Sequence, residues 1–94
     1  MNKSKRKGDN FERQVVNEAK SYMLEAYRFY CSRSPLEDKV DVVVAGRHLQ
    51  CKKRAKGFKE IYKWLETGID GLVISADYKE PLIVLKYKDW LKLL

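Results

Sequence analysis

The sequence predicts an α/β domain in which a mixed central sheet is flanked by helices. Three observations lead to this fold class. Apolar residues recur at three- and four-residue steps after residue 9, a strongly β-prone run covers residues 40–45, and two further short apolar runs follow a second helical pattern. With 94 residues the chain is long enough for one domain with a single core.

The amino-terminal segment is predicted to be a flexible basic arm followed by a helix. Residues 1–8 are polar, strongly basic and end at Gly8. Asp9 is a residue type that caps helices, and Glu12 follows three residues later, as in a capping box. The apolar positions with helical spacing are Phe11, Val15, Val16, Ala19, Tyr22, Met23 and Ala26.

The central part of the chain is predicted to supply three strands. Residues 28–32 fit a short strand, and residues 32–39 read as a loop because they combine a proline with several charges. Residues 40–45 form the second strand, with a tight turn at Gly46–Arg47, and residues 48–53 return as its hairpin partner.

The remainder predicts a helix at residues 58–66, strands at 72–76 and 82–85, and a short helix at 87–94. The predicted order is therefore α-β-β-β-α-β-β-α. The pattern contains no internal repeat, so residues 9–94 are expected to form a single domain.

Composition points to a polyanionic partner. Lys and Arg number 20 against 13 Asp and Glu, which gives a net charge of +7. A solvated surface with surplus lysines is the simpler alternative. Cys31, Cys51 and the lone His48 do not form a zinc-binding pattern, and buried structural roles are expected for both cysteines. No secretory or membrane-spanning apolar run is present, so a cytoplasmic protein without a membrane partner is expected.

The chemically informative stretch combines Asp41 with Gln50-Cys51-Lys52. Strand alternation places Asp41 on one face of its strand, and Gln50 and Lys52 together on one face of the next. A carboxylate, an amide oxygen and the backbone carbonyl of Cys51 are oxygen ligands for a hard divalent cation. A lysine beside them is suited to orienting an attacking water or stabilising charge on a phosphate.

This arrangement resembles the PD-(D/E)XK nucleases, which place Asp, then Asp or Glu, then Lys on one hairpin. The stretch Lys7-Gly8-Asp9-Asn10-Phe11-Glu12-Arg13 is also similar to the start of archaeal and phage Holliday junction resolvases, where the first turn of a helix carries a catalytic Glu. The likeness runs from Lys7 through the last strand. It implies a restriction-endonuclease-like core with Mg²⁺ or Mn²⁺ as cofactor. The compactness of the chain points to a phage or prokaryotic protein. The implied catalytic residues are Glu12, Asp41, Gln50 and Lys52, and the implied metal ligands are Glu12, Asp41, Gln50 and the backbone carbonyl of Cys51.

Two positions depart from the pattern of that family. Val40 stands where the motif has proline, and Gln50 stands where it has an acid. A neutral amide still coordinates, but the loss of a negative charge lowers affinity for a hard cation. Three explanations remain open: the site works with Gln, helped by another carboxylate such as Glu60; the fold has kept binding and lost catalysis; or Gln50 is an engineered substitution.

Each of these residues also has a purely structural interpretation. Asp41 fits a strand-entry residue paired with Lys39 or Arg47, Glu12 fits the acid of a capping box, and Lys52 fits a solvated lysine.

The expected substrate is branched DNA, in particular a four-way junction cut by a homodimer, because a two-fold symmetric junction requires two active sites. Trp64 and Trp90 are candidates for the dimer contact. A non-catalytic nucleic-acid-binding protein on the same fold and a protein-interaction module are the alternatives. Backbone phosphates are expected to contact Lys5, Arg6, Lys7, Arg13, Ser32, Arg33, Ser34, Lys53, Arg54 and Lys56.

Overall fold

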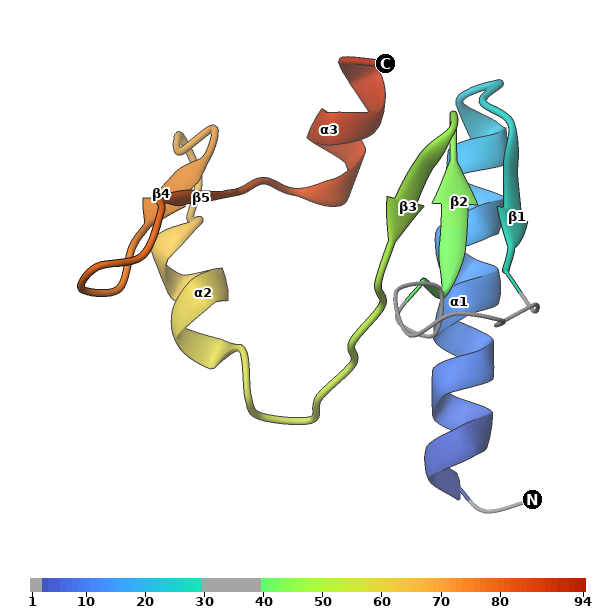
Figure 1. Cartoon of the computed structure of the whole chain (residues 1–94), viewed down its shortest axis with the longest axis horizontal. Helices are drawn as coiled ribbons and strands as arrows, with labels where there is room; N and C mark the ends of the chain where they lie inside the picture. Colours follow the sequence, from blue (N-terminus) through green and yellow to red (C-terminus); the bar gives the residue numbers. More distant parts are fainter. Residues whose placement is uncertain (1–2, 30–39) are drawn as a thin grey trace. The chain divides into compact units, whose positions relative to one another are not determined.

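A computed structural model describes residues 3–29 and 40–94, and the predicted order of elements is confirmed (Figure 1). The chain divides into two compact units, residues 1–53 and 54–94. The single domain expected over 9–94 stays a prediction. Each unit is described by itself. The elements are α1 (Lys3–Ser21), β1 (Ala26–Arg28), β2 (Val42–Val44), β3 (Arg47–Leu49), α2 (Lys59–Trp64), β4 (Leu72–Ile74), β5 (Leu82–Val84) and α3 (Tyr87–Lys92).

The first unit is a three-stranded antiparallel sheet, ordered β1-β2-β3, with α1 packed on β1 and β2 (Figure 1). Its core forms where one apolar side of α1 meets the central strand. Val15, Val16 and Ala19 are buried on α1, and all three residues of β2 are buried. The continuous β-branched run of β2 fits a central strand that is covered on both sides.

Helix α1 begins at Lys3, six residues before the expected cap at Asp9. The segment expected to be an arm is thus helical from Lys3, because lysine and arginine are good helix formers and one internal glycine costs only about 1 kcal/mol. Asp9 lies inside the helix and cannot cap it. The expected capping box between Asp9 and Glu12 is therefore wrong, and both carboxylates bind a distant arginine instead.

The hairpin between β2 and β3 turns at Ala45–Gly46, one residue earlier than predicted. Both residues have positive φ, 49° and 81°, as in the two-residue type I′ turn that matches the twist of paired strands. The third strand ends at Leu49, so the expected strand over 48–53 is shorter and Gln50 and Lys52 lie beyond it. The first strand likewise precedes its predicted range, of which residues 30–32 lie outside the described part of the chain.

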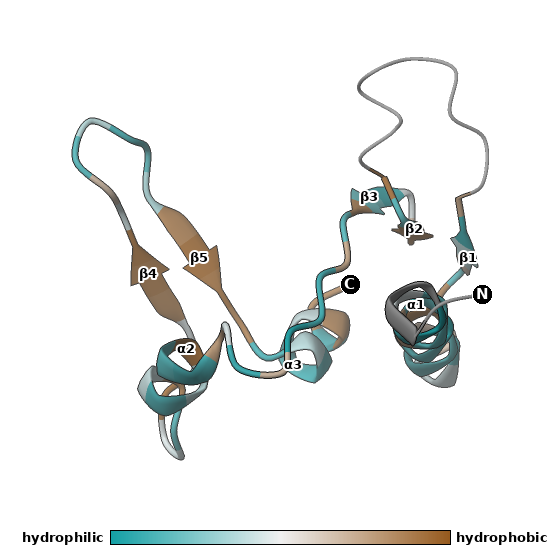
Figure 2. Ribbon diagram, turned by 90° about the horizontal axis from the view of Figure 1, so that it is seen from below, coloured by the Kyte–Doolittle hydropathy of each residue, from teal (hydrophilic) through white to brown (hydrophobic). Residues whose placement is uncertain are grey.

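The second unit contains α2, the β4–β5 antiparallel hairpin and α3. Leu65 and Leu91 are its buried residues. The hydropathy colouring shows two apolar strands (Figure 2), and Val73, Leu82 and Ile83 on them are exposed. Gly71 lies where a Cβ atom would approach the Leu85 side chain to 2.8 Å, so a larger residue here would require that side chain to shift.

The α/β class is therefore confirmed at the level of helices and short strands. All pairings between the described strands are antiparallel and fall in two small sheets, so the mixed central sheet of a restriction-endonuclease-like core stays a prediction. None of the described helices is sufficiently long and apolar to cross a membrane.

Candidate functional site

Asp41 is held from three directions at the start of β2. Its N–H donates to the Leu49 carbonyl and its carbonyl accepts from the Phe29 N–H, both at 2.9 Å. Its side-chain Oδ2 accepts a 2.7 Å hydrogen bond from the Cys51 backbone N–H. The side chain thus continues the pairing of the two strands one step beyond the last ladder bond. The predicted alternative partner Arg47 donates to the Ala45 carbonyl instead, and Lys39 lies outside the described residues.

The thiol of Cys51 reports the electrostatics of this region. Burial raises its pKa from the ordinary 9.0 to about 11, and the charges of Asp41 and then Glu12 add to the effect. The contribution of Asp41 agrees with the geometry, because its carboxylate is hydrogen-bonded to the Cys51 N–H. Glu12 comes from α1 and Asp41 from the edge of β2. Of these two predicted site residues, Asp41 contacts Cys51 directly, whereas Glu12 is bound by Arg28.

Glu12 is fixed by Arg28, a residue that sequence reasoning missed. Arg28 donates from Nε and Nη2 to the same oxygen, Glu12 Oε1, at 3.1 and 3.0 Å. Its Nη2 also donates to Asp9 Oδ1 at 3.0 Å. The side chains of Arg28, Asp9 and Glu12 are only 15%, 25% and 21% exposed. The sequence does contain a pattern that could have predicted this partner. Asp9 and Glu12 are three residues apart and share one helix face, and two neighbouring carboxylates favour a nearby cation.

Gln50 and Lys52 are exposed beyond the end of β3. No hydrogen bond or ion pair links either side chain to another described residue. No hydrogen bond or ion pair joins any two of the four predicted catalytic side chains among the described residues, so their convergence stays a prediction. The backbone at position 51 is anchored between Gln50 and Lys52 by the bond to Asp41, so both lie next to a fixed point.

Three of the predicted phosphate-contacting residues line one cavity of about 390 Å³, together with Asn10. Arg6 and Lys7 come from α1, and Lys53 comes from the segment after β3, with its ammonium 5.5 Å from the centroid of the Phe11 ring. This cavity contains no acidic lining residue. Arg13 is exposed on the same helix, and Arg54 and Lys56 are exposed at the start of the second unit. The Lys5 side chain, Ser32, Arg33 and Ser34 lie outside the described residues.

The donor chemistry of the predicted ligands fits a hard divalent cation, because carboxylate, amide and carbonyl oxygens are what Mg²⁺ and Mn²⁺ bind. The described residues contain no group of three or more His, Cys, Asp or Glu side chains that could hold a metal ion. With only two carboxylates in the predicted set, the amide oxygen of Gln50 and a backbone carbonyl are needed to complete it.

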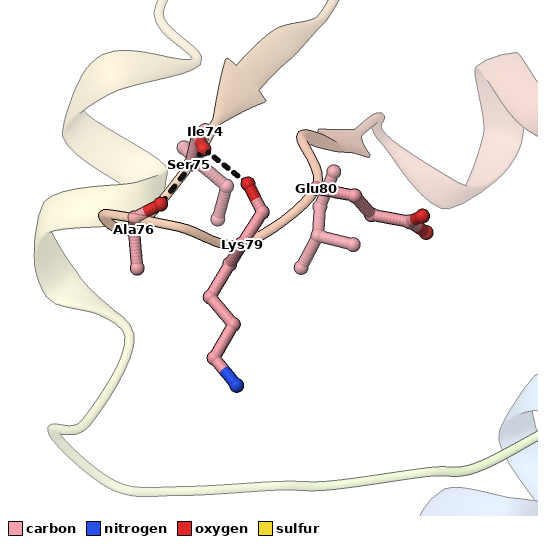
Figure 3. A pocket seen from close by; sticks show the side chains of 6 residues that line it. Ile74, Ser75, Ala76, Lys79 and Glu80 are labelled. Atoms are coloured by element: carbon pink, nitrogen blue, oxygen red, sulfur yellow. Dashed lines mark hydrogen bonds between the residues drawn. The ribbon is translucent and has the colours of Figure 1, made fainter.

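A pocket in the second unit has no comparable chemistry (Figure 3). It lies at the turn between β4 and β5, where the Ser75 hydroxyl is 3.1 and 3.0 Å from the carbonyls of Ala76 and Lys79. The Lys79 ammonium and the Glu80 carboxylate point away from that hydroxyl. Ser75 therefore stabilises the turn, and no described residue bonds to its hydroxyl as a base that would activate a nucleophile.

Comparison with known proteins adds no relative: no protein-family model, curated protein or solved structure matches the chain.

Proposed function

We propose that this chain is a metal-dependent DNA endonuclease of the PD-(D/E)XK type, similar to the Holliday junction resolvases, with an activity limited by Gln50. The supporting observation is the hydrogen bond from the Cys51 N–H to the Asp41 carboxylate, which holds this acid beside the backbone between Gln50 and Lys52. A carboxylate, an amide oxygen and a lysine on two adjoining segments are the kinds of group that metal-assisted phosphodiester hydrolysis uses.

The chain's own residues have distinct parts in this proposal. Asp41, with Oδ2 engaged by the Cys51 N–H, would offer its second oxygen to a cation, and Glu12 would offer Oε2, because Oε1 is engaged by Arg28. The amide oxygen of Gln50 and the carbonyl of Cys51 would complete the ligands. The exposed ammonium of Lys52 would orient the attacking water. A bound Mg²⁺ would lower the pKa of that water and screen the phosphate charge.

The substrate side of the proposal depends on charge. The net charge of +7 and the basic cavity lined by Arg6, Lys7 and Lys53 support contacts to the phosphate backbone without base reading. The second candidate function, a nucleic-acid-binding protein without catalysis, is favoured by Gln50 alone. It keeps the phosphate contacts and does without the metal.

A comparison of the present chain with Gln50→Glu tests the two functions. Both are incubated with a labelled four-way junction and a linear duplex of the same sequence, with Mg²⁺, with Mn²⁺ and with chelator. We expect metal-dependent, symmetric nicks in the junction from Gln50→Glu, and much weaker cleavage from the present chain. The Asp41→Asn change, added to Gln50→Glu, serves as the control and should abolish the nicks. Binding of DNA by both proteins without any cleavage would replace the nuclease with the binding protein.

Salt dependence tests the phosphate contacts separately from catalysis. Each phosphate contact to duplex DNA contributes about 0.9 to the slope of log affinity against log salt. Lys53→Met should reduce the slope by about this amount, whereas Lys63→Met, an equal loss of charge on exposed α2, should leave it unchanged. Equal slopes for Lys53→Met and the unchanged chain would remove this lysine from the interface. Sedimentation of the protein with and without junction DNA tests the proposed homodimer.

A further inference from the structure

A basic cavity lies in the second unit, around the start of α2. It has a volume of about 560 Å³, and its lining residues are Arg54, Ala55, Lys56, Phe58, Lys59 and Tyr62. Half of these residues are cations and none is acidic. The three cations are exposed, and none of them forms an ion pair with another described residue. Unpaired positive charge of this kind attracts a polyanionic ligand.

Tyr62 sets this cavity apart from an ordinary charged surface. Its side chain is on α2 and is 77% exposed. The Tyr62 N–H donates to the Phe58 carbonyl at 3.2 Å, so the two aromatic residues are one helical turn apart on one side of α2. Glu60 is about 160° away from Tyr62 around the helix axis, so its carboxylate is on the other side. The exposed ring thus offers a face on which another flat group can stack.

Arg54 is held against the turn that precedes α2. A Cβ atom built at Gly57 would lie 3.3 Å from both Cβ and Cγ of Arg54. The stem of the arginine therefore runs across the backbone of Gly57, in the space that a larger residue would occupy. This contact keeps Arg54 at the cavity that Tyr62 lines from the helix.

Cations beside an exposed ring are the two parts of a binding site for unpaired nucleic acid. The cations contact backbone phosphates, and the ring stacks on a base with little regard to its identity. Inside a duplex each base is covered on both faces by its neighbours, whereas an unpaired base has a face free for a protein ring. An acidic peptide would satisfy the cations but would leave the ring without a base to stack on.

We propose that this cavity binds an unpaired stretch of nucleic acid, with Tyr62 stacked on one base and Arg54, Lys56 and Lys59 on neighbouring phosphates. The inference goes beyond the proposed function, in which the chain contacts phosphates alone. Binding at this cavity requires neither a metal ion nor cleavage. The chain should therefore prefer nucleic acid with single-stranded segments over a continuous duplex.

The affinity for a labelled oligothymidine strand, measured by fluorescence anisotropy in chelator, tests the stacking. Tyr62→Ala should weaken binding about tenfold, and Tyr62→Phe by less than twofold because phenylalanine keeps the ring. Tyr78→Ala removes a fully exposed tyrosine from the turn between β4 and β5 of the same unit, and should leave the affinity unchanged. Equal affinities of the unchanged chain and the folded Tyr62→Ala protein would overturn the inference.

An abasic strand of the same length separates stacking from charge. On this strand Tyr62→Ala should lower the affinity by less than twofold, because no base is present. The same loss on both strands would mean that Tyr62 acts through the protein structure, which would overturn its stacking role. Polyglutamate is the second competitor. If it binds as tightly as oligothymidine and loses tenfold on Tyr62→Ala, the ligand is an acidic peptide and the inference is wrong.

The phosphate contacts are measured by the salt dependence of the same binding. Each phosphate contact to a single strand contributes about 0.7 to the slope of log affinity against log salt. Lys59→Met should lower the slope by about this amount, and Lys92→Met, an equal loss of charge on exposed α3, should leave it unchanged. Equal slopes for Lys59→Met and the unchanged chain would remove the cavity from the interface.

Photocrosslinking to a strand that contains 5-iodouracil locates the stacked ring. After trypsin digestion we expect the crosslink in the peptide of residues 60–63, in which Tyr62 is the single aromatic residue. A crosslink confined to residues 64–79, which contain Trp64 and Tyr78, or to the first unit would overturn the site. Junction cleavage without any binding of single strands would also overturn this inference and leave the proposed nuclease standing. Single-strand binding that depends on Tyr62, without cleavage, would have the opposite meaning.

Discussion

The thiol of Cys51 allows the assembly of the candidate site to be measured without any substrate. Burial, Asp41 and Glu12, in that order of importance, raise its pKa from 9.0 to about 11. A shift of two units lowers the thiolate population at neutral pH about a hundredfold, and alkylation proceeds through the thiolate. We therefore expect iodoacetamide to react with Cys51 about a hundredfold more slowly in the folded chain than in urea.

The Asp41→Asn change should raise the alkylation rate of Cys51 several-fold, and Glu12→Gln should raise it by a smaller factor. Both variants should retain a midpoint above 9.0, because burial is the largest cause of the shift. Asparagine keeps a side-chain oxygen that can accept the Cys51 N–H, so the change removes the charge with little loss of geometry.

The assay is the alkylation rate as a function of pH, measured by mass spectrometry in a Cys31→Ser background. The midpoint of the profile gives the pKa, and the plateau gives steric access, so the two effects separate. Glu25→Gln, an exposed acid of the same unit, serves as the control and should leave the midpoint unchanged. If Glu12→Gln leaves the midpoint where it was, Glu12 does not lie near Cys51 and the two-carboxylate site is wrong.

Three further changes test the surrounding structure. Arg28→Met should lower the free energy of unfolding in urea by about 1–3 kcal/mol, with Arg28→Lys closer to the unchanged chain, because two part-buried carboxylates lose their cation. Ala45→Asn should raise the melting temperature, corresponding to about 0.5–1 kcal/mol, since the turn holds Ala45 at positive φ, where asparagine is better tolerated. The raised pKa of Cys51 means that the folded state keeps its proton longer than the unfolded state, so its contribution to stability is present below pH 9 and is lost between pH 9 and about 11. Cys51→Ser should remove that part of the alkaline decline in denaturation curves, and an identical decline in both proteins would contradict it.

The order of helices and strands could be predicted from the sequence because it depends on local periodicity. The β-branched run at residues 42–44 favours a buried central strand, and the structure has one there. The start of α1 could not be predicted from the same kind of signal. Gly8 and Asp9 have the residue types of a helix boundary. In the structure Asp9 lies inside the helix and binds Arg28, which is nineteen residues away on a strand.

The candidate site was predictable to the extent that residue type limits chemistry. Asp41 and Glu12 were chosen as acids, and in the structure they bind different partners: Asp41 accepts from the Cys51 N–H, and Glu12 binds the Arg28 guanidinium. The placement of Gln50 and Lys52 depended on a strand that in fact stops at Leu49, because the Asp41 side chain takes over the N–H of residue 51. A side chain that replaces a ladder bond leaves no trace in hydrophobic alternation.

The bond between Asp41 and residue 51 also limits how these two positions can vary among related chains. At position 51 the donor is a backbone N–H, which every amino acid except proline supplies. Many residue types at position 51, including ones without a thiol, would therefore leave this hydrogen bond unchanged. At position 41 the acceptor is a short side chain of fixed reach, so only aspartate or asparagine keeps the bond, and only aspartate keeps the charge. Among related chains we therefore expect little variation at position 41, before β2, and wide variation at position 51, after β3.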